Sequence, residues 1–262
     1  MTKVDQSTHN SLIVEQFTKQ AIPFTQKSEH SNENEFQLMF ALTEVSSSDK
    51  VLDLACGSGF VSCAFAKIAH HVTGIDVTPA MIERARLLQQ EKQLNNLFWQ
   101  IGNVLQLLYE DATFSLVITR YSFHHFIDPQ AVLAQMCRVC MPGGKVAVVD
   151  VTPAPGKVTA YNYMEKLRDP SHTKALTFAE LQEMFHQAGL INIKTGSYQV
   201  EMQLEKQLQA SFPNHGDANK IRQLFIEDLT TDSLGVSSYR RGTEIYFAYP
   251  VSVIVGQKDI LK

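Results

Sequence analysis

The sequence lacks the features that would place a 262-residue chain in a membrane, on a nucleic acid or in an oxidising compartment. No apolar run approaches the ~20 residues that a membrane-spanning helix needs, and residues 1–10 are polar, without a signal-peptide pattern. Lys and Arg number 23 against 27 Asp and Glu, so no surplus of cations favours polyanion binding. Four cysteines make no disulfide framework in a chain of this length. We therefore expect a cytoplasmic protein that binds no nucleic acid and does not insert stably into a membrane.

Short apolar runs without polar alternation are separated by segments with helical periodicity. The expected strands are 51–54, 72–76, 97–101, 114–119, 145–151 and 244–255, the last with Pro250 marking an edge or a bulge. The expected helices between them are 60–69, 79–93 and 128–140. Strands that are apolar throughout are typical of a parallel sheet covered on both faces. The pattern therefore predicts an α/β fold.

Four other stretches predict helices that cover the sheet: 12–24, 33–45, 155–172 and 200–240. Cys137 and Cys140 form a C-x-x-C, but they fall late in an expected helix and no second pair occurs. We therefore expect no metal site.

The segment from Asp53 to Gly59 is a glycine-containing turn between a strand and a helix. Gly57 and Gly59 allow the backbone to turn tightly and to approach a ligand at the helix N-terminus. A tight turn without any ligand is the alternative interpretation. Asp76, at the end of the next strand, favours a ligand, because a carboxylate there accepts hydrogen bonds from ribose hydroxyls. Asp53 would repel a pyrophosphate but suits an ammonium group, so the pattern favours an adenosine ligand with positive charge.

These residues resemble the class I S-adenosylmethionine-dependent methyltransferases, and within them the ubiquinone/menaquinone-biosynthesis-type group of small-molecule enzymes. The motifs that carry the resemblance are V-L-D-L-A-C-G-S-G at 51–59, G-I-D at 74–76, G-N-V at 102–104 and M-P-G-G-K at 141–145. The resemblance implies a Rossmann-like, seven-stranded, mostly parallel sheet with an antiparallel last strand. It also implies an N-terminal helical lid at 1–45 and a methyltransferase domain at 46–262, with cap insertions near 155–175 and 200–240.

The resemblance further implies roles in binding S-adenosylmethionine. Asp53 would lie near the methionine ammonium group, and Asp76 would hold the ribose hydroxyls. Ala55 stands where many members have Gly, and Asn103 where many have an Asp that contacts the adenine amino group; the amide oxygen of Asn103 can still accept from that group. The remaining implied cofactor contacts are Gly57, Gly59, Val77, Met81, Val104 and Arg120.

The acceptor side is expected after the later strands, where ligands bind in open parallel sheets. His124 and His125 follow the strand 114–119, and either could act as a general base near neutral pH, or could only pack and hydrogen-bond. Helical spacing places Tyr161, Glu165 and Arg168 on one face, before an R-D-P-S-H element seen in related enzymes. One interpretation of that face is a lid over the acceptor, in which Glu165 is a further candidate base and Tyr161 and Arg168 bind the acceptor. The alternative is a cap helix whose charges are exposed to solvent.

Phe17 and Phe24 lie in the amphipathic stretch at the expected lid position, where aromatic side chains would exclude water from the reacting groups. The alternative is a helix that simply covers the sheet edge.

Taken together, the sequence predicts an enzyme that transfers a methyl group from S-adenosylmethionine to a small organic acceptor in secondary or cofactor metabolism. Non-methyl chemistry on the same cofactor, such as an intramolecular cyclisation, is one alternative. A non-catalytic nucleoside-binding protein and a nicotinamide-dependent oxidoreductase are two others. The identity of the acceptor, the methylated atom and the formation of a homodimer stay open at this stage.

Overall fold

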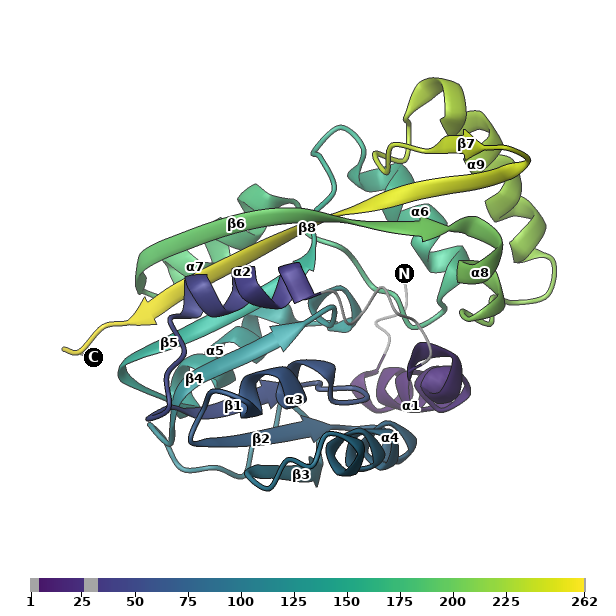
Figure 1. Ribbon diagram of the computed structural model, residues 1–262. Coiled ribbons are helices and arrows are strands. Elements are labelled where there is room, and N and C mark those ends of the chain that lie inside the picture. Colours follow the sequence, from purple (N-terminus) through teal and green to yellow (C-terminus); the bar gives the residue numbers. More distant parts are fainter. Residues whose placement is uncertain (1–4, 26–32, 262) are drawn as a thin grey trace.

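The computed structural model describes residues 5–25 and 33–261. Its central feature is an eight-stranded sheet with the order β3-β2-β1-β4-β5-β8-β6, in which β7 adds to β8 (Figure 1). The strands are β1 Lys50–Leu54, β2 His71–Asp76, β3 Leu97–Ile101, β4 Phe114–Arg120, β5 Cys140–Val151, β6 Leu190–Gln203, β7 Tyr239–Arg241 and β8 Glu244–Lys258. β1 to β5 are parallel, whereas β8 is antiparallel to β5, β6 and β7. The predicted Rossmann-like α/β fold is confirmed.

Helices cover both faces of the sheet. They are α1 Gln6–Thr25, α2 Glu33–Thr43, α3 Phe60–Ala66, α4 Pro79–Glu91, α5 Pro129–Val139, α6 Val158–Arg168, α7 Phe178–Gln187, α8 Leu204–Gln209 and α9 Asp217–Thr231, with a 3₁₀ turn at Phe123–His125. Successive residues of β5 alternate between two separate cores, Ala147 and Val149 in one and Val146 and Val148 in the other. This burial on both sides explains why the strands show no polar alternation.

Strand order reverses between β1 and β4, whose carboxyl ends therefore border a crevice. β1 pairs with β2 on one side and with β4 on the other, with Leu54 opposite both Ile75 and Thr119. The Thr119 hydroxyl donates to the Leu54 carbonyl at 2.7 Å, which ties the ends of the two strands together. Segments that follow these strands are thus held beside one another at the crevice.

Two expectations about the later strands were wrong. Residues 200–203 belong to β6, a 14-residue strand that the sequence pattern did not reveal because its residues are largely exposed and mixed in polarity. The strand expected at 145–151 begins already at Cys140, which pairs with Phe114 of β4. The register shifts before Lys145 pairs with Leu116, and Gly143 in the intervening segment has a φ of 77°.

Pro250 does not lie on an edge strand, since β8 runs between β5 and β6. The pairing of β8 with β5 ends at Val251, and β7 begins to pair only at Tyr246. The Pro250 carbonyl accepts from the Thr152 amide at 2.8 Å, so the proline nitrogen faces this gap between β5 and β7. The missing N–H therefore costs the sheet no regular ladder hydrogen bond.

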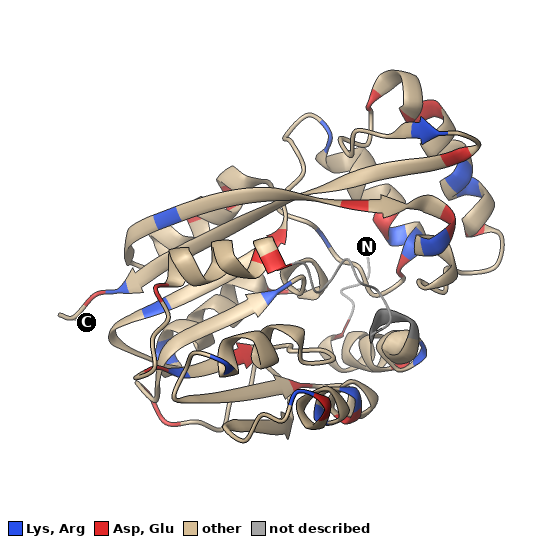
Figure 2. Ribbon diagram, viewed as in Figure 1, with Lys and Arg blue, Asp and Glu red and all other residues tan. Residues whose placement is uncertain are grey.

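The ends of β6 and β8 continue beyond β5 and carry a cap. Val200–Gln203 pairs with Tyr246–Tyr249 where β5 has already ended, and α8, α9 and β7 gather at this end beside α6 (Figure 1). Lys, Arg, Asp and Glu are intermixed over α8, α9 and β7, while the strands of the central sheet carry few charges (Figure 2). None of the described helices has the length and apolar character needed to cross a membrane.

Candidate active site

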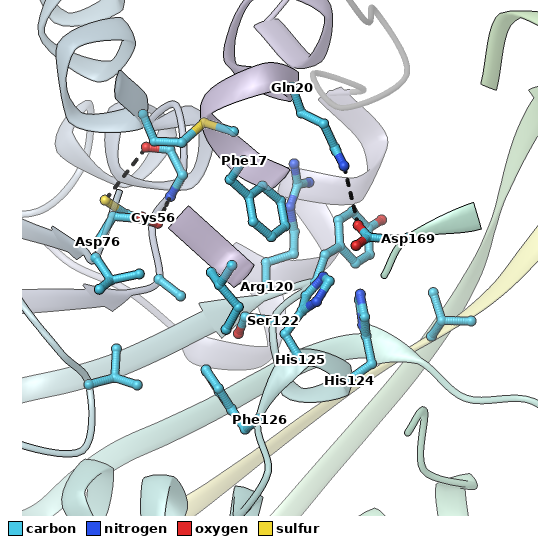
Figure 3. Close-up of a pocket in the computed structure, with 18 of the residues that line it drawn as sticks. Phe17, Gln20, Cys56, Asp76, Arg120, Ser122, His124, His125, Phe126 and Asp169 are labelled. Atoms are coloured by element: carbon cyan, nitrogen blue, oxygen red, sulfur yellow. Dashed lines mark hydrogen bonds between the residues drawn. The ribbon is translucent and has the colours of Figure 1, made fainter. Parts of the chain in front are cut away.

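A cavity opens at the carboxyl ends of β1, β2, β4 and β5, and it continues beneath α1 and α6 to the extended ends of β6 and β8. Figure 3 shows Cys56 and Asp76 on one side of it, His124, His125 and Asp169 on the other, and Phe17 and Arg120 between them. The cavity brings together the predicted site residues Phe17, Asp53, Ala55, Gly57, Asp76, Val77, Met81, Asn103, Val104, Arg120, His124, His125, Tyr161, Glu165 and Arg168.

Asp76 ends β2 with its carboxylate buried and anchored by backbone amides. Its Oδ2 accepts from the Gly57 amide at 2.9 Å, and its Oδ1 from the Thr78 amide at 2.8 Å. Burial raises the pKa of Asp76, against these hydrogen bonds that lower it. Each oxygen retains a second lone pair, so the carboxylate can still accept from two hydroxyl groups. This arrangement fits the vicinal hydroxyls of a ribose.

Asp53 lies at the end of β1, 1% exposed, with its Oδ2 accepting from the Ser62 hydroxyl at 2.6 Å. Burial raises the pKa of Asp53 to about 7, although Ser62 and the charge of Arg120 act in the opposite direction. A cationic group brought into the cavity would favour the ionised form of this carboxyl. Asp53 is therefore suited to an ammonium group.

The turn between β1 and α3 requires unusual backbone conformations. Ala55 has a φ of 50°, in the left-handed region that glycine adopts without a Cβ clash, so this position favours glycine. Gly59 has a φ of 84°, and a Cβ there would lie 2.6 Å from the Trp99 ring. Gly59 therefore holds the turn against β3 and does not line the cavity, unlike the other predicted cofactor residues.

The residues of this end fit S-adenosylmethionine. Ser58 lines the cavity with a buried hydroxyl that has no hydrogen-bond partner within the described part of the chain, and a Cβ on Gly57 would meet open space. Val77, Met81 and Val104 supply an apolar wall for an adenine ring. The Asn103 oxygen accepts from the Leu105 amide at 2.9 Å, which leaves it one lone pair for an amino group.

Arg120, predicted as a cofactor contact, lies at the end of β4 between the two ends of the cavity. Its guanidinium is 3.4 Å from the Glu35 carboxylate and lies over the rings of Phe36 and Tyr121, at 5.0 and 4.8 Å from their centroids. Burial raises the pKa of Glu35 to about 7, and Arg120 opposes the shift. Much of the Arg120 charge is thus engaged with α2, while the side chain still borders the cavity.

The two adjacent histidines have different environments. The His124 Nδ1 lies 2.6 Å from the Asp150 Oδ1. His125 is enclosed, with its Nδ1 3.1 Å from the Ser171 hydroxyl and its ring edge against Phe17. Burial and the neighbouring His124 lower the pKa of His125 to about 3, so this ring is a poor proton acceptor.

Glu165 and Arg168 of α6 form a buried ion pair beside the cavity, with Arg168 Nη2 2.6 Å from Glu165 Oε2. The Tyr249 hydroxyl donates to the other Glu165 oxygen at 2.8 Å, and Arg168 Nη1 donates to the Ser211 hydroxyl at 3.0 Å. Glu165 is therefore engaged on both oxygens, which argues against a role for it as a free base. The alternative of a solvated cap helix is wrong for this face.

Helix α1 covers the cavity through polar contacts as well as through Phe17. The His9 Nε2 lies 2.7 Å from the His125 carbonyl oxygen, and the Gln16 amide donates to the Ser211 carbonyl at 2.6 Å. The Gln20 amide donates to the Asp169 carboxylate at 3.3 Å (Figure 3). The side chain of Phe24, also predicted for the lid, lies outside the described residues.

The sequence reasoning missed several cavity residues. Asp150 is a single carboxylate directly after the apolar run 146–149 of β5, and that position is the sequence signal that indicates it. Gln20, Asp169, Tyr249 and Ser58 also border the cavity. Gln20 lies on α1 and Tyr249 on the β8 extension, which no local motif indicated, whereas Ser58 and Asp169 lie within motifs that the sequence shows.

The chain is similar to known methyltransferases. The pattern of a family described as "Methyltransferase domain" matches residues 45–223. The uncharacterised methyltransferase YcgJ of Bacillus subtilis is 30% identical over 171 residues, which cover 64% of this chain and 68% of that protein. Demethylmenaquinone methyltransferase of Oceanobacillus iheyensis is 29% identical over 177 residues, covering 59% of this chain and 74% of the relative.

Solved structures share the fold. The crystal structure of YcgJ aligns with a TM-score of 0.79 at 24% identity, covering 87% of this chain and 99% of that one. A phosphoethanolamine N-methyltransferase of Haemonchus contortus, solved with S-adenosyl-L-methionine, aligns with a TM-score of 0.63 at 13% identity, over 87% of this chain and 53% of its own. The family match covers most of the chain, and the residues around Asp53 and Asp76 fit the cofactor. The chain therefore belongs to the class I methyltransferase family and uses S-adenosylmethionine.

Proposed function

We propose that this enzyme methylates a small organic acceptor in secondary or cofactor metabolism. The observation that carries the proposal is the continuation of the cavity past Arg120 into a compartment enclosed by α1, α6 and the extended strands. This compartment is lined mainly by apolar and aromatic side chains, among them Phe126, Val151, Val200, Met202 and Val251. Such a lining suits a small, largely apolar molecule. The printed name of the relative from Oceanobacillus, a demethylmenaquinone methyltransferase, is consistent with an acceptor of this kind.

Bound S-adenosylmethionine supplies an electrophilic methyl group on a cationic sulfur. The chain's own residues bind, orient and shield the reactants. In the proposal Asp76 holds the ribose, Asp53 and Ser58 hold the amino-acid part, and Phe17 keeps water from the reacting groups. Close alignment of two bound reactants accounts for most of the rate enhancement that such a transfer needs.

We also propose that residues 1–45 act as a lid on the domain formed by 46–262. In support, the described part of α1 contacts segments that come much later in the chain, through Gln16 to Ser211 and Gln20 to Asp169. Buried glutamine and histidine side chains make these contacts, and water can replace their hydrogen bonds when the helix lifts. The lid would admit the acceptor and then exclude solvent.

Turnover with labelled cofactor tests the proposed function. The purified enzyme is incubated with S-adenosylmethionine labelled in its methyl group, with and without a small-molecule extract, and the products are followed by mass spectrometry. We expect label on a metabolite and one S-adenosylhomocysteine per transfer, only when the extract is present. Conversion of the cofactor alone would indicate non-methyl chemistry. Cofactor binding without S-adenosylhomocysteine from any extract would indicate a nucleoside-binding protein.

A further inference from the structure

Two histidines, His124 and His125, line the acceptor end of the cavity, and neither Nε2 has a hydrogen-bond partner among the described residues. Only His124 has its other ring nitrogen held by a carboxylate. The His124 Nδ1 is held by the Asp150 Oδ1 at 2.6 Å, and the His124 amide donates to the Asp150 Oδ2 at 3.2 Å. The Val151 amide, at 2.7 Å, fixes the same carboxylate. With Nδ1 directed at a carboxylate, the ring takes the tautomer in which Nε2 carries the lone pair. His124 lines the cavity, and its Nε2 has no partner among the described residues.

A hydrogen-bond donor lies in the same compartment. Tyr161 of α6 is 2% exposed and lines the cavity, and its hydroxyl has no hydrogen bond to any residue in the described ranges. Burial raises the pKa of Tyr161, and Glu165, Tyr249 and Asp150 add to the shift, so this hydroxyl remains protonated and can donate. Tyr161 and His124 both line this cavity. A base and a donor therefore face the same space.

Three carboxylates, those of Asp150, Glu165 and Asp169, and one guanidinium, that of Arg168, surround this space. Arg168 is paired with Glu165, and Asp169 accepts from the Ser171 hydroxyl at 2.6 Å and from Gln20. The pKa of His124 is raised. Burial and the charge of Arg168 lower it, but the carboxylates of Asp150 and Glu165 raise it by more. His172 and His125, which lie beside it, have lowered pKa values through burial and are neutral. An anionic acceptor would find no unpaired cation among the described residues here, and the apolar lining of the cavity favours a neutral acceptor.

We propose that His124, oriented by Asp150, is the proton acceptor of the reaction, and that the acceptor is a neutral, mainly apolar compound with a phenol- or enol-type hydroxyl. This proposal rests on the proposed function. The acceptor oxygen gives its proton to Nε2 of His124 while it accepts a hydrogen bond from Tyr161. The electron pair released on the oxygen or its conjugated carbon forms the bond to the methyl carbon, and the electron pair of the broken carbon–sulfur bond stays on sulfur. Imidazole can deprotonate a phenol or an enol, whereas an aliphatic alcohol is too weak an acid.

The test uses 4-nitrophenol as the probe, because its phenolate absorbs visible light and its neutral form does not. The wild-type protein, saturated with S-adenosylhomocysteine, is titrated with the probe at one pH unit below the pKa of the free probe. We expect the bound probe to be mostly phenolate.

Two variants test the roles of the two side chains. His124→Asn keeps a donor toward Asp150 but removes Nε2, and Asp150→Asn removes the carboxylate. In both variants we expect the phenolate-to-phenol ratio of the bound probe to fall at least about tenfold. Tyr161→Phe should lower the ratio by less.

His172→Gln is the matched control, because His172 is buried 5.4 Å from the His124 ring but does not line the cavity. A glutamine can keep the hydrogen bond to Asn162, and we expect this variant to retain the phenolate spectrum. A neutral bound probe in the wild type, no bound probe, or phenolate retained in His124→Asn would each overturn the proposal. Calorimetry on the same samples measures the affinity for S-adenosylhomocysteine and separates the proposed function from the proposed role of His124. Failure of the wild-type protein to bind S-adenosylhomocysteine would count against the proposed function.

Discussion

The two ends of the cavity are built in different ways. At the cofactor end, Asp53, Gly57 and Asp76 lie within 24 residues of sequence, and the carboxylates are held by nearby backbone and hydroxyl groups. At the acceptor end, contacts join residues far apart, such as Tyr249 with Glu165 and Gln16 with Ser211. At the cofactor end, the buried Arg120 is paired with Glu35 on α2, whereas at the acceptor end Glu165 is paired with Arg168 and Asp150 with His124. The first end thus suits a cationic ligand, and the second suits a neutral one.

The largest expected effect comes from breaking the charge pairing at the acceptor end. Arg168→Met leaves the 2%-exposed Glu165 without its cation, and we expect the free energy of unfolding to fall by about 3–5 kcal/mol. Urea denaturation measures the change. Adding Glu165→Gln should recover a large part of it, because the uncompensated charge disappears. Lys174→Met, in the exposed Lys174–Glu180 pair, is the control and should cost less than about 1 kcal/mol. Equal losses of unfolding free energy in Arg168→Met and Lys174→Met would contradict the difference expected between the buried and the exposed ion pair.

At the cofactor end, Asp76→Ala removes the acceptor for the ribose hydroxyls. We expect the affinity for S-adenosylhomocysteine to fall by about 100-fold or more, since hydrogen bonds to a charged group contribute about 1.5–3 kcal/mol each. Isothermal titration calorimetry measures the affinity. Asp76→Asn, which keeps one acceptor oxygen, should bind with intermediate affinity. An unchanged affinity in the alanine variant would show that the ribose assignment is wrong.

The raised pKa of Asp53 predicts pH-dependent cofactor binding. With a pKa of about 7, the carboxyl is largely protonated at pH 6 and largely ionised at pH 8, so S-adenosylhomocysteine affinity should rise about tenfold between these values. Asp53→Asn should bind more weakly at pH 8 and lose this dependence. A wild-type affinity that falls as pH rises would contradict the prediction.

The raised pKa of Asp53 also makes the stability of the cofactor-free protein depend on pH. Because the pKa of Asp53 is higher in the folded chain than the ordinary value of 3.8, the folded state holds the proton more tightly. The unfolding free energy should therefore fall as pH rises from about 4 to 7, and Asp53→Asn should remove this part of the decline. Thermal melts across that range provide the measurement.

The smallest expected effect concerns the turn between β1 and α3. Ala55→Gly relieves a left-handed alanine, and we expect it to stabilise the protein by about 0.5–1 kcal/mol. Ala112→Gly, also at positive φ but outside the cavity lining, should stabilise similarly without any change in cofactor affinity. A loss of stability in Ala55→Gly alone would show that the Ala55 methyl group contributes more through packing than its backbone strain costs.

The contrast between the two ends also explains which parts of the site could be predicted. The β1–α3 turn, Asp53 and Asp76 were recognisable because a parallel sheet places successive strand ends at one edge, so a local motif defines a position in space. His124 and Tyr161 were found as candidates from their place after β4 and β5. Their chemistry was not predictable, because it depends on Asp150, whose partner lies 26 residues away.

By itself the sequence determined the α/β fold, the parallel strands and the cofactor class, and it indicated most residues that line the cofactor end of the cavity, because hydrophobic periodicity and short turns are local properties. Only the tertiary structure decided which histidine is held by a carboxylate, that Glu165 is paired with Arg168, and that α1 and the ends of β6 and β8 border the second end of the cavity. Protonation and hydrogen bonding depend on burial and on neighbours distant in the chain, and those are settled only when the strands and helices pack together.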